Sequence, residues 1–236
     1  MTHVTTIAAT ELRLILRSKT VLFSATAMPL AFAVFVVAQR EATASAGVAM
    51  LGMVMTFFAL FSIYATVTTT AVTRRQDLYL KRLRSGESSD VSILAGIVAP
   101  PVLLCLVQTL VVFAAMFAIG VKFPGQWWWG VVAFLGIIAV CTSVALATAA
   151  VTPNPSAAQL SSLPFAMAVL GTFVAAPVTE NRWFDLTPGG AVVTLVRAAY
   201  ELDLYGSIPV AVASLVLWTW GGVDLTKRLF RWEART

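Results

Sequence analysis

Long apolar blocks dominate the sequence, and short polar segments, most of them basic, separate these blocks. A helix needs about 20 apolar residues to cross a bilayer core about 30 Å thick, so each block predicts one membrane span. Proline cannot continue a helix, which places a turn at Thr152-Pro153-Asn154-Pro155-Ser156 and should kink or break the third span at Pro100-Pro101. The six predicted spans cover residues of about 21–38, 47–73, 91–120, 127–151, 160–177 and 208–224.

The segments between the spans are too short for a separate soluble domain. We therefore interpret residues 1–236 as a single all-α membrane domain. Composition supports this interpretation, because 59% of the residues are apolar and 11% are charged, whereas soluble domains carry roughly 25% charged residues. A soluble globular protein is excluded, and the net charge of +5 does not by itself predict a nucleic-acid partner.

Lysine and arginine are unevenly distributed between the two sides of the predicted membrane. An even number of spans places both termini on one side, and twelve of the 16 basic residues fall on that side. Basic residues accumulate in cytoplasmic loops. Both termini of this multi-pass protein are therefore predicted to be cytoplasmic.

Residues that could carry chemistry are sparse. Cys105 and Cys141 lie within apolar runs and His3 is the single histidine, so we expect no metal site, and we find no catalytic or cofactor-binding motif. The sequence contains no Gly-x-x-x-x-Gly-Lys-Ser/Thr phosphate loop for ATP. Proton-coupled carriers need ionisable side chains at membrane depth, and the predicted spans hold almost none. A transporter of this kind must take its energy from another chain.

Residues 1–20 can be drawn as an amphipathic helix that precedes the first span. Leu12 and Leu16 share an apolar stripe, and Arg13 and Arg17 share a polar one. Such a helix would lie in the cytoplasmic interface of the membrane. It is either a simple anchor or a helix that also contacts a cytoplasmic partner.

The cytoplasmic segment at residues 74–90 mixes basic and apolar side chains, which a solvated loop does not require. At helical spacing its charged and apolar side chains fall on different sides, and Ser85-Gly86 offers a stop. Two interpretations are open: a basic loop on anionic lipid, and a short helix that docks into a cleft of another subunit. The docking residues would be Arg75, Asp77, Tyr79, Leu80, Lys81, Arg82, Leu83 and Arg84.

On the opposite side of the membrane, residues 179–207 are too polar to form a further span. An apolar stretch of about half a span within them suits a re-entrant or interfacial helix, and a simple extracellular loop is the alternative. If helical, the segment would cover the outer end of a pathway. The residues expected in this outer gate region are Trp183, Pro188, Gly189, Gly190 and Arg197.

These features together resemble the permease subunits of ABC type 2 exporters over nearly the whole chain. The stretch Glu11-Leu12-Arg13-Leu14-Ile15-Leu16-Arg17 is similar to the connecting helix of that family, and Lys81-Arg82-Leu83-Arg84 is similar to the basic end of its coupling helix. Leu186-Thr187-Pro188 resembles the start of its outer re-entrant region. Arg75-Gln76-Asp77-Leu78-Tyr79 stands where the family often has Arg-Glu-x-Gly-Thr.

The resemblance implies a six-span permease with a connecting helix that carries Glu11, Arg13 and Arg17, and with a coupling helix that docks on an ATPase. It implies a second permease, identical or paralogous, and cytoplasmic P-loop ATPases that bind ATP and magnesium. The complex would export a hydrophobic or amphiphilic substrate, of drug, lipid-like or polyketide type, across a bacterial plasma membrane. The chain itself would not be an enzyme, and membrane lipid would be its other partner.

Two other classes stay open at this point. An ion-coupled carrier or passive channel would work without an ATPase, but it needs relay or pore-lining charges. A membrane enzyme or assembly factor rests only on the outer acidic residues Glu180, Asp185, Glu201 and Asp203.

Overall fold

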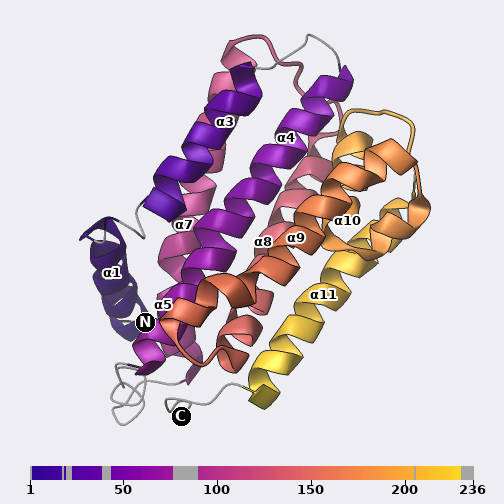
Figure 1. Ribbon diagram of the computed structural model, residues 1–236. Helices are drawn as coiled ribbons and strands as arrows, with labels where there is room; N and C mark the ends of the chain where they lie inside the picture. The colour runs from indigo at the N-terminus through magenta and orange to yellow at the C-terminus, as the bar shows by residue number, and fades with distance from the viewer. Residues whose placement is uncertain are drawn as a thin grey trace.

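The computed structural model describes residues 2–17, 19, 23–38, 44–76, 90–204 and 206–229, and every regular element in these ranges is a helix. The long helices form one bundle, with the first helix lying outside it (Figure 1). The elements, in chain order, are α1 (Thr2–Arg17), η1 (Phe23–Ala27), α3 (Met28–Ala38), α4 (Ala44–Phe58), η2 (Ala59–Ala65), α5 (Thr66–Gln76), α7 (Asp90–Ala118), α8 (Trp127–Val151), α9 (Pro155–Thr179), η3 (Arg182–Leu186), α10 (Pro188–Ala199) and α11 (Ile208–Leu229).

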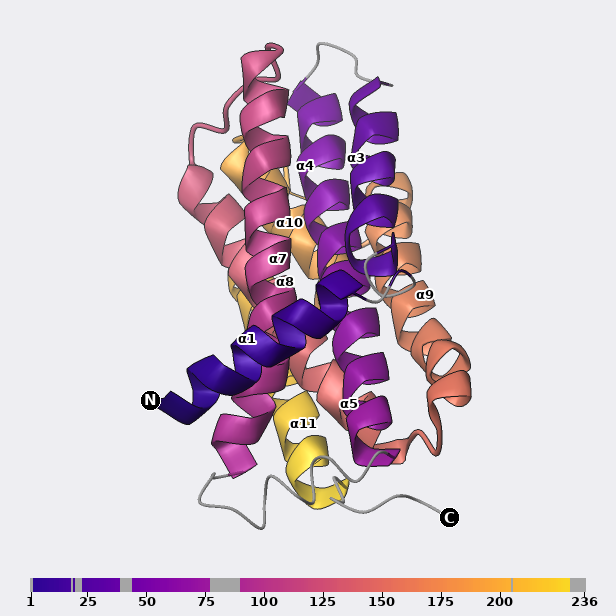
Figure 2. The same ribbon diagram turned by 90° about the vertical axis from the view of Figure 1, so that its left-hand side faces the viewer.

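The bundle has two distinct ends. We call the end at which α5, α8 and α11 finish the lower end, and the end at which α8 and α11 begin the upper end, as they appear in Figure 1. Helix α1 packs obliquely across α7 in the lower half of the bundle (Figure 2). The polar connection between α8 and α9 lies at the lower end, and α10 lies toward the upper end.

Five described helices are long and apolar enough to cross a membrane: Met50–Gln76, Val91–Ala118, Trp127–Val151, Pro155–Thr179 and Ile208–Leu229. The first apolar block differs, because its described part consists of the short π-helix η1 and the 11-residue α3. The apolar helix found there, Ala25–Phe35, is shorter than a span. Length and composition therefore support five of the six predicted spans. The remaining one, the first span at 21–38, stays a prediction.

The continuous helix formed by α4, η2 and α5 lies at the centre of the bundle. In its most apolar stretch 83% of the residues are buried, against 22% in the corresponding stretches of α9 and α11. Phe58, Ile63 and Tyr64 share one core with Ile137 and Cys141 of α8. The outer helices present exposed apolar side chains on their other faces. In a membrane protein these faces meet lipid or another membrane helix.

Helix α7 runs without interruption through Pro100 and Pro101, so the expected break at this pair is wrong, and the alternative of a kink stays a prediction. Each proline removes one backbone donor from the helix. Both proline side chains are buried against neighbouring helices, and membrane helices tolerate proline where neighbouring helices or local adjustments satisfy the freed carbonyls.

Candidate functional site

At the lower end, the last turn of α5 is joined to α1 by a two-pronged ion pair. Arg74 Nε and Nη2 donate to Oε1 and Oε2 of Glu11 at 2.8 and 3.0 Å. The Glu11 side chain is only 1% exposed, so the pair is largely shielded from solvent. Arginine and carboxylate in this geometry form one of the stronger and more directional polar contacts in proteins. The pair fixes α1 against the end of α5.

The next residue, Arg75, contacts a different part of the chain. Its side chain is 1% exposed, and Nη1 donates to the carbonyl oxygens of Ala149 at 2.9 Å and of Ala150 at 3.4 Å. Nη2 donates to the carbonyl oxygen of Thr152. The last carbonyls of a helix lack partners within the helix and carry partial negative charge. The guanidinium of Arg75 therefore serves as the C-terminal cap of α8.

The turn between α8 and α9 is itself well defined. Gln76 Nε2 donates to the carbonyl of Pro153 at 3.4 Å, which adds a third contact from the end of α5. Asn154 caps α9, because its Oδ1 accepts from Ala157 N at 2.8 Å and from Ser156 Oγ at 2.7 Å. Three segments that are distant in sequence thus meet at residues 74–76.

The predicted docking residues are placed only in part. Asp77, Tyr79, Leu80, Lys81, Arg82, Leu83 and Arg84 lie outside the described residues. Arg75 is described, and its guanidinium is turned into the chain rather than outward. A direct contact between Arg75 and another subunit would require its bonds to α8 to break, so the docking role predicted for Arg75 stays a prediction.

Of the residues predicted for the connecting helix, Glu11 alone makes a described contact with α5, whereas Arg13 and Arg17 are exposed. Sequence reasoning did not find the partners of Arg74 and Arg75. One signal was present: α8 ends in Ala149-Ala150-Val151, which offers no side chain to satisfy its own last carbonyls.

Midway along the bundle, a small polar cluster joins the two π-helical segments. Ser62 Oγ of η2 lies 2.8 Å from the carbonyl oxygen of Ala25 in η1 and 3.2 Å from Gln108 Oε1, and it can donate to either. Gln108 Nε2 donates to the same Ala25 carbonyl at 3.1 Å. π-helical turns occur frequently at functional sites. This cluster connects the first apolar block to α7 and to the central helix.

At the upper end, α10 is packed among the other helices instead of lying on the surface. Of its 12 residues all but Arg197 are buried. Its last residue, Ala199, accepts a backbone hydrogen bond from Gln126 at the start of α8, at 3.0 Å. Before α10, the carbonyl of Leu186 accepts from Trp218 Nε1 of α11 at 3.0 Å. These two bonds join the segment to the start of α8 and to α11.

Two glycines allow this close packing. A Cβ atom at Gly189 would lie 2.1 Å from the carbonyl oxygen of Val169, and one at Gly190 would lie 2.2 Å from that of Phe184. Both contacts are with backbone, which cannot move aside as a flexible side chain can. Thr187 completes the start of α10, because its Oγ1 accepts from Gly190 N at 3.2 Å.

Asp185 holds the upper segment together and was not among the residues predicted for the outer gate. Its side chain accepts from Thr194 Oγ1 at 2.6 Å and from the backbone N of Ser207 at 2.6 Å. The residue is 3% exposed. Sequence alone suggested Asp185 only as one of four outer acidic residues. The structure instead places it as the link between η3, α10 and the segment that leads into α11.

The predicted outer residues separate into two groups. Pro188, Gly189 and Gly190 are buried at the start of α10, whereas Trp183 is 64% exposed beneath Arg182, whose Cζ lies 5.6 Å from the ring centroid. Arg197 Nε donates to the carbonyl of Asp203 at 2.7 Å.

After α10, burial raises the pKa of the Tyr200 hydroxyl to about 12, so this group stays neutral near pH 7.

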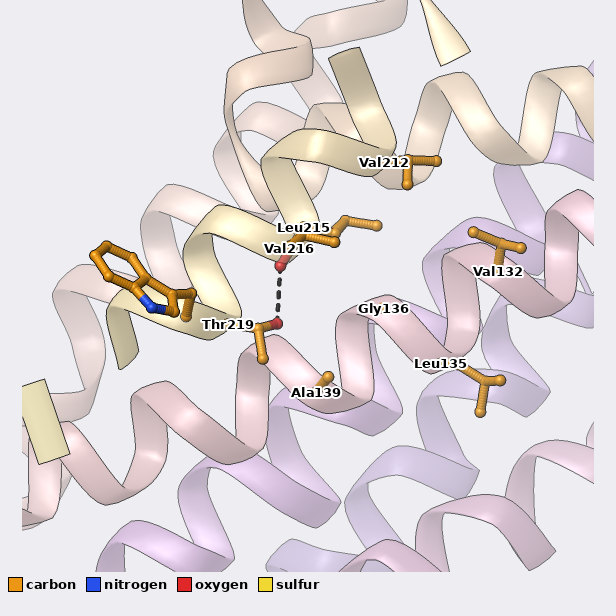
Figure 3. Close-up of a pocket in the computed structure, with 9 residues that line it drawn as sticks. Val132, Leu135, Gly136, Ala139, Val212, Leu215, Val216 and Thr219 are labelled. Carbon is orange, nitrogen blue, oxygen red and sulfur yellow. Dashed lines mark hydrogen bonds between the residues drawn. The ribbon is translucent and has the colours of Figure 1, made fainter. Parts of the chain in front are cut away.

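An apolar groove of about 510 Å³ runs along the outside of the bundle between α8 and α11 (Figure 3). Gly136 and Ala139 of α8 and Val212 of α11 line it. The hydroxyl of Thr219 donates to the carbonyl of Leu215 at 2.8 Å, so it is already paired within its own helix. The groove offers apolar contacts to a lipid or a membrane helix.

Within the described ranges, no group of three or more His, Cys, Asp or Glu side chains could hold a metal ion.

Comparison with known proteins agrees with this arrangement. Residues 2–185, which include α1, the end of α5 and the turn between α8 and α9, match the family described as ABC-2 type transporter. No protein of curated function matches the chain. The domain that defines this family is a transport subunit and is not itself catalytic. The resemblance found in the sequence is thereby confirmed: the chain belongs to the ABC-2 type transporter family, as a multi-pass permease component of an ABC transporter.

Proposed function

We propose that this chain is the membrane-spanning permease of an ATP-driven exporter and that a separate P-loop ATPase subunit supplies the energy. The junction at the lower end carries the proposal. There the end of α5 is bonded to α1 through Arg74 and to the end of α8 through Arg75, immediately before the basic segment 77–89. A force applied to that segment would reach three parts of the bundle at once. Members of the family normally work with an ATPase subunit.

In this proposal the ATPase binds residues 77–84 and holds the ATP and magnesium, and the chain itself has no cofactor. Nucleotide-driven closure of the ATPases shifts the permease between inward-facing and outward-facing arrangements. The lower end faces the cytoplasm of a bacterial cell, so both termini are cytoplasmic. The upper end faces outward, where α10 forms a re-entrant helix over the end of the pathway.

A second permease, identical or paralogous, completes the pathway. Apolar side chains exposed on α3 and α9 support this assignment, among them Phe35, Met167 and Val174. These faces carry no charged side chain in the described parts of α3 and α9, which suits a hydrophobic or amphiphilic substrate of drug, lipid-like or polyketide type. Membrane lipid covers the remaining outer faces.

The proposal is tested by purifying the tagged chain in mild detergent and identifying by mass spectrometry what stays bound. The test variant is the double substitution Tyr79→Ala with Leu83→Ala. Burial of each side chain in a docking cleft is worth about 1.5–3 kcal/mol. The amount of ATPase that stays bound to the variant should therefore fall about tenfold or more. The matched control is Leu103→Ala with Leu110→Ala on the exposed face of α7, which should retain the ATPase in full.

Recovery of a P-loop ATPase that the test variant releases and the control keeps would support the exporter. Failure to recover any ATPase, under conditions in which a known exporter retains its own, would contradict it. The chain would then be an ion-coupled carrier or a passive channel. Transport that a protonophore abolishes and vanadate does not would identify the ion-coupled carrier.

A further inference from the structure

The last two basic residues of α5 contact different segments although they are neighbours in sequence. Successive side chains on a helix point about 100° apart, so Arg74 and Arg75 face different neighbours. Arg74 reaches Glu11 on α1, and Arg75 reaches the end of α8. The end of α5 is therefore connected to α1 through Arg74, and to the end of α8 and the turn after it through Arg75 and Gln76.

The connection through Arg75 is well suited to hold its two ends in a fixed relation. The guanidinium is planar and rigid, and here it contacts the carbonyls of Ala149, Ala150 and Thr152. The side chain is 1% exposed, so water does not compete for these bonds. The carbonyl end of α8 is also the negative end of its dipole, which favours a cation there.

The turn beyond α8 passes any displacement on to α9. Thr152, Pro153 and Asn154 form a short connection that the Asn154 cap on Ala157 N keeps in register with α9. In the lower half of α9, Ala158 and Ser162 are buried, whereas Leu160 and Leu163 are 71% and 52% exposed and so are not covered by another described helix of this chain. The upper half is held against α10 by Val169 and Phe173. A shift of the turn would therefore tilt the lower half of α9.

We infer that Arg75 is a positioning residue that makes the end of α5 and the α8–α9 turn move as one unit, so that movement at the end of α5 tilts α9. This inference rests on the proposed ATPase-driven function. It assigns to Arg75 a role inside the permease, separate from docking, and it assigns to Arg74 a connection to α1.

The experiment follows α9 directly with a spin label, in the complex of the chain with its ATPase. Cys105 and Cys141 are replaced by alanine, and a single label is attached at Gln159→Cys on the exposed face of α9 or, separately, at Arg13→Cys on α1. Spectra are recorded without nucleotide and after trapping with ATP and vanadate. The nucleotide-dependent change is divided by the amount of ATPase bound, so that loss of docking is not mistaken for loss of coupling.

Arg75→Gln should reduce the nucleotide response at residue 159 about tenfold, within the ordinary range of allosteric coupling, and should leave the response at residue 13 intact. Arg74→Gln is the matched control: it should reduce the response at residue 13 and leave the response at residue 159 intact. Arg75→Lys keeps the charge but has one nitrogen in place of a fork, so an intermediate reduction is expected. A response at residue 159 that is equal in wild type, Arg75→Gln and Arg75→Lys would overturn the inference, as would a wild-type complex with no response there.

A second measurement needs no substitution at Arg75 and decides the question if Arg75→Gln fails to fold. Spin labels at Gln76→Cys and Pro153→Cys report their separation by dipolar broadening. The inference predicts that ATP and vanadate leave this broadening unchanged while the label at residue 159 responds. A nucleotide-dependent change in the broadening would overturn the inference. If no ATPase binds the wild-type chain, the proposed function itself fails, and that result is distinct from both of these.

Discussion

The two ends of the bundle are held together in different ways. At the upper end, α10 is seated by close approach of backbone to backbone at Gly189 and Gly190, and the Asp185 carboxylate ties it to neighbouring segments. At the lower end, the segments are joined by long side chains, chiefly Arg74 and Arg75. Backbone packing of this kind does not tolerate displacement, whereas hydrogen bonds from a rigid guanidinium can hold two segments together while both of them move.

This difference fits the division of work in the ATP-driven exporter proposed above. The driven end must transmit movement between helices without unfolding, and polar side-chain links can do so. At the opposite end, α10 would keep its close contact with α9 while the helices below it tilt. Substitutions at the upper end should therefore cost folding stability, and substitutions at the lower end should mainly change how segments move together.

The largest expected effect comes from filling the space at Gly189. The Cβ atom of Gly189→Val would lie 2.1 Å from the Val169 carbonyl, so α10 could not seat against α9. The variant should not yield a monodisperse folded protein by size-exclusion chromatography in detergent. Gly171→Val, at a position of α9 with open space around it, should behave as wild type. A folded Gly189→Val protein would show that the upper end is less closely packed than described.

A smaller loss is expected when the carboxylate that joins the upper segments is removed. Asp185→Ala leaves the hydroxyl of Thr194 and the amide of Ser207 without their acceptor, which should cost about 3 kcal/mol of unfolding free energy. Denaturation in mixed micelles measures the change. Asp203→Ala, at an exposed side chain, should change stability by less than about 0.5 kcal/mol. Equal effects of the two substitutions would contradict the role given to Asp185.

At the lower end, Glu11→Gln should cost less stability and loosen α1. The amide removes the charge that pairs with Arg74 and should cost about 2 kcal/mol, below the full penalty for breaking a buried pair because Arg74 is 20% exposed. Limited trypsin digestion at the exposed Arg13 and Arg17 should become faster. Asp224→Asn breaks the exposed pair with Arg228 and should change stability by less than about 0.5 kcal/mol. An unchanged rate of digestion in Glu11→Gln would contradict the claim that the Glu11–Arg74 pair holds α1 in place.

The smallest effect is expected at Tyr200, whose hydroxyl is buried with no hydrogen-bond partner among the described atoms. Near pH 7, Tyr200→Phe should change stability by less than about 0.5 kcal/mol. Burial raises the pKa of the native tyrosine to about 12, whereas an unfolded tyrosine ionises near pH 10. Between pH 10 and 12 the tyrosine ionises in the unfolded state but not in the native state, so the free energy of unfolding falls over this range. Tyr200→Phe should remove that loss, and an identical pH profile in both proteins would contradict the burial of this hydroxyl.

Much of the helical arrangement was predictable, because it depends on local signals. Helix α8 covers the residues of the fourth predicted span, and the prolines of the turn after it separate α8 from α9 as expected. Helix α9 begins at Pro155, five residues before the predicted span at 160, because proline is favoured in the first turn of a helix and Asn154 caps it. Helix α11 continues past 224 because Lys227 and Arg228 suit the last turn of a helix.

The links at the two ends were not predictable, because they depend on which distant segments meet. Nothing near Arg75 in the sequence points to the carbonyls of α8, which lie more than 70 positions away. Asp185 likewise reads as one of several outer acids until the fold places Thr194 and Ser207 against it. The two glycines before the apolar stretch are evident in the sequence, but their close contacts with Val169 and Phe184 depend on the tertiary structure.

The central claim is that this permease works as part of an ATP-driven complex. Native mass spectrometry of the complex purified through the tagged chain tests it most directly, because it reports the mass and composition of the intact assembly. The account predicts a particle with two permease chains, identical or paralogous, and two P-loop ATPase subunits, which loses the ATPases in the Tyr79→Ala, Leu83→Ala variant. A particle that contains only permease chains, under conditions in which a known exporter stays intact, would contradict the account.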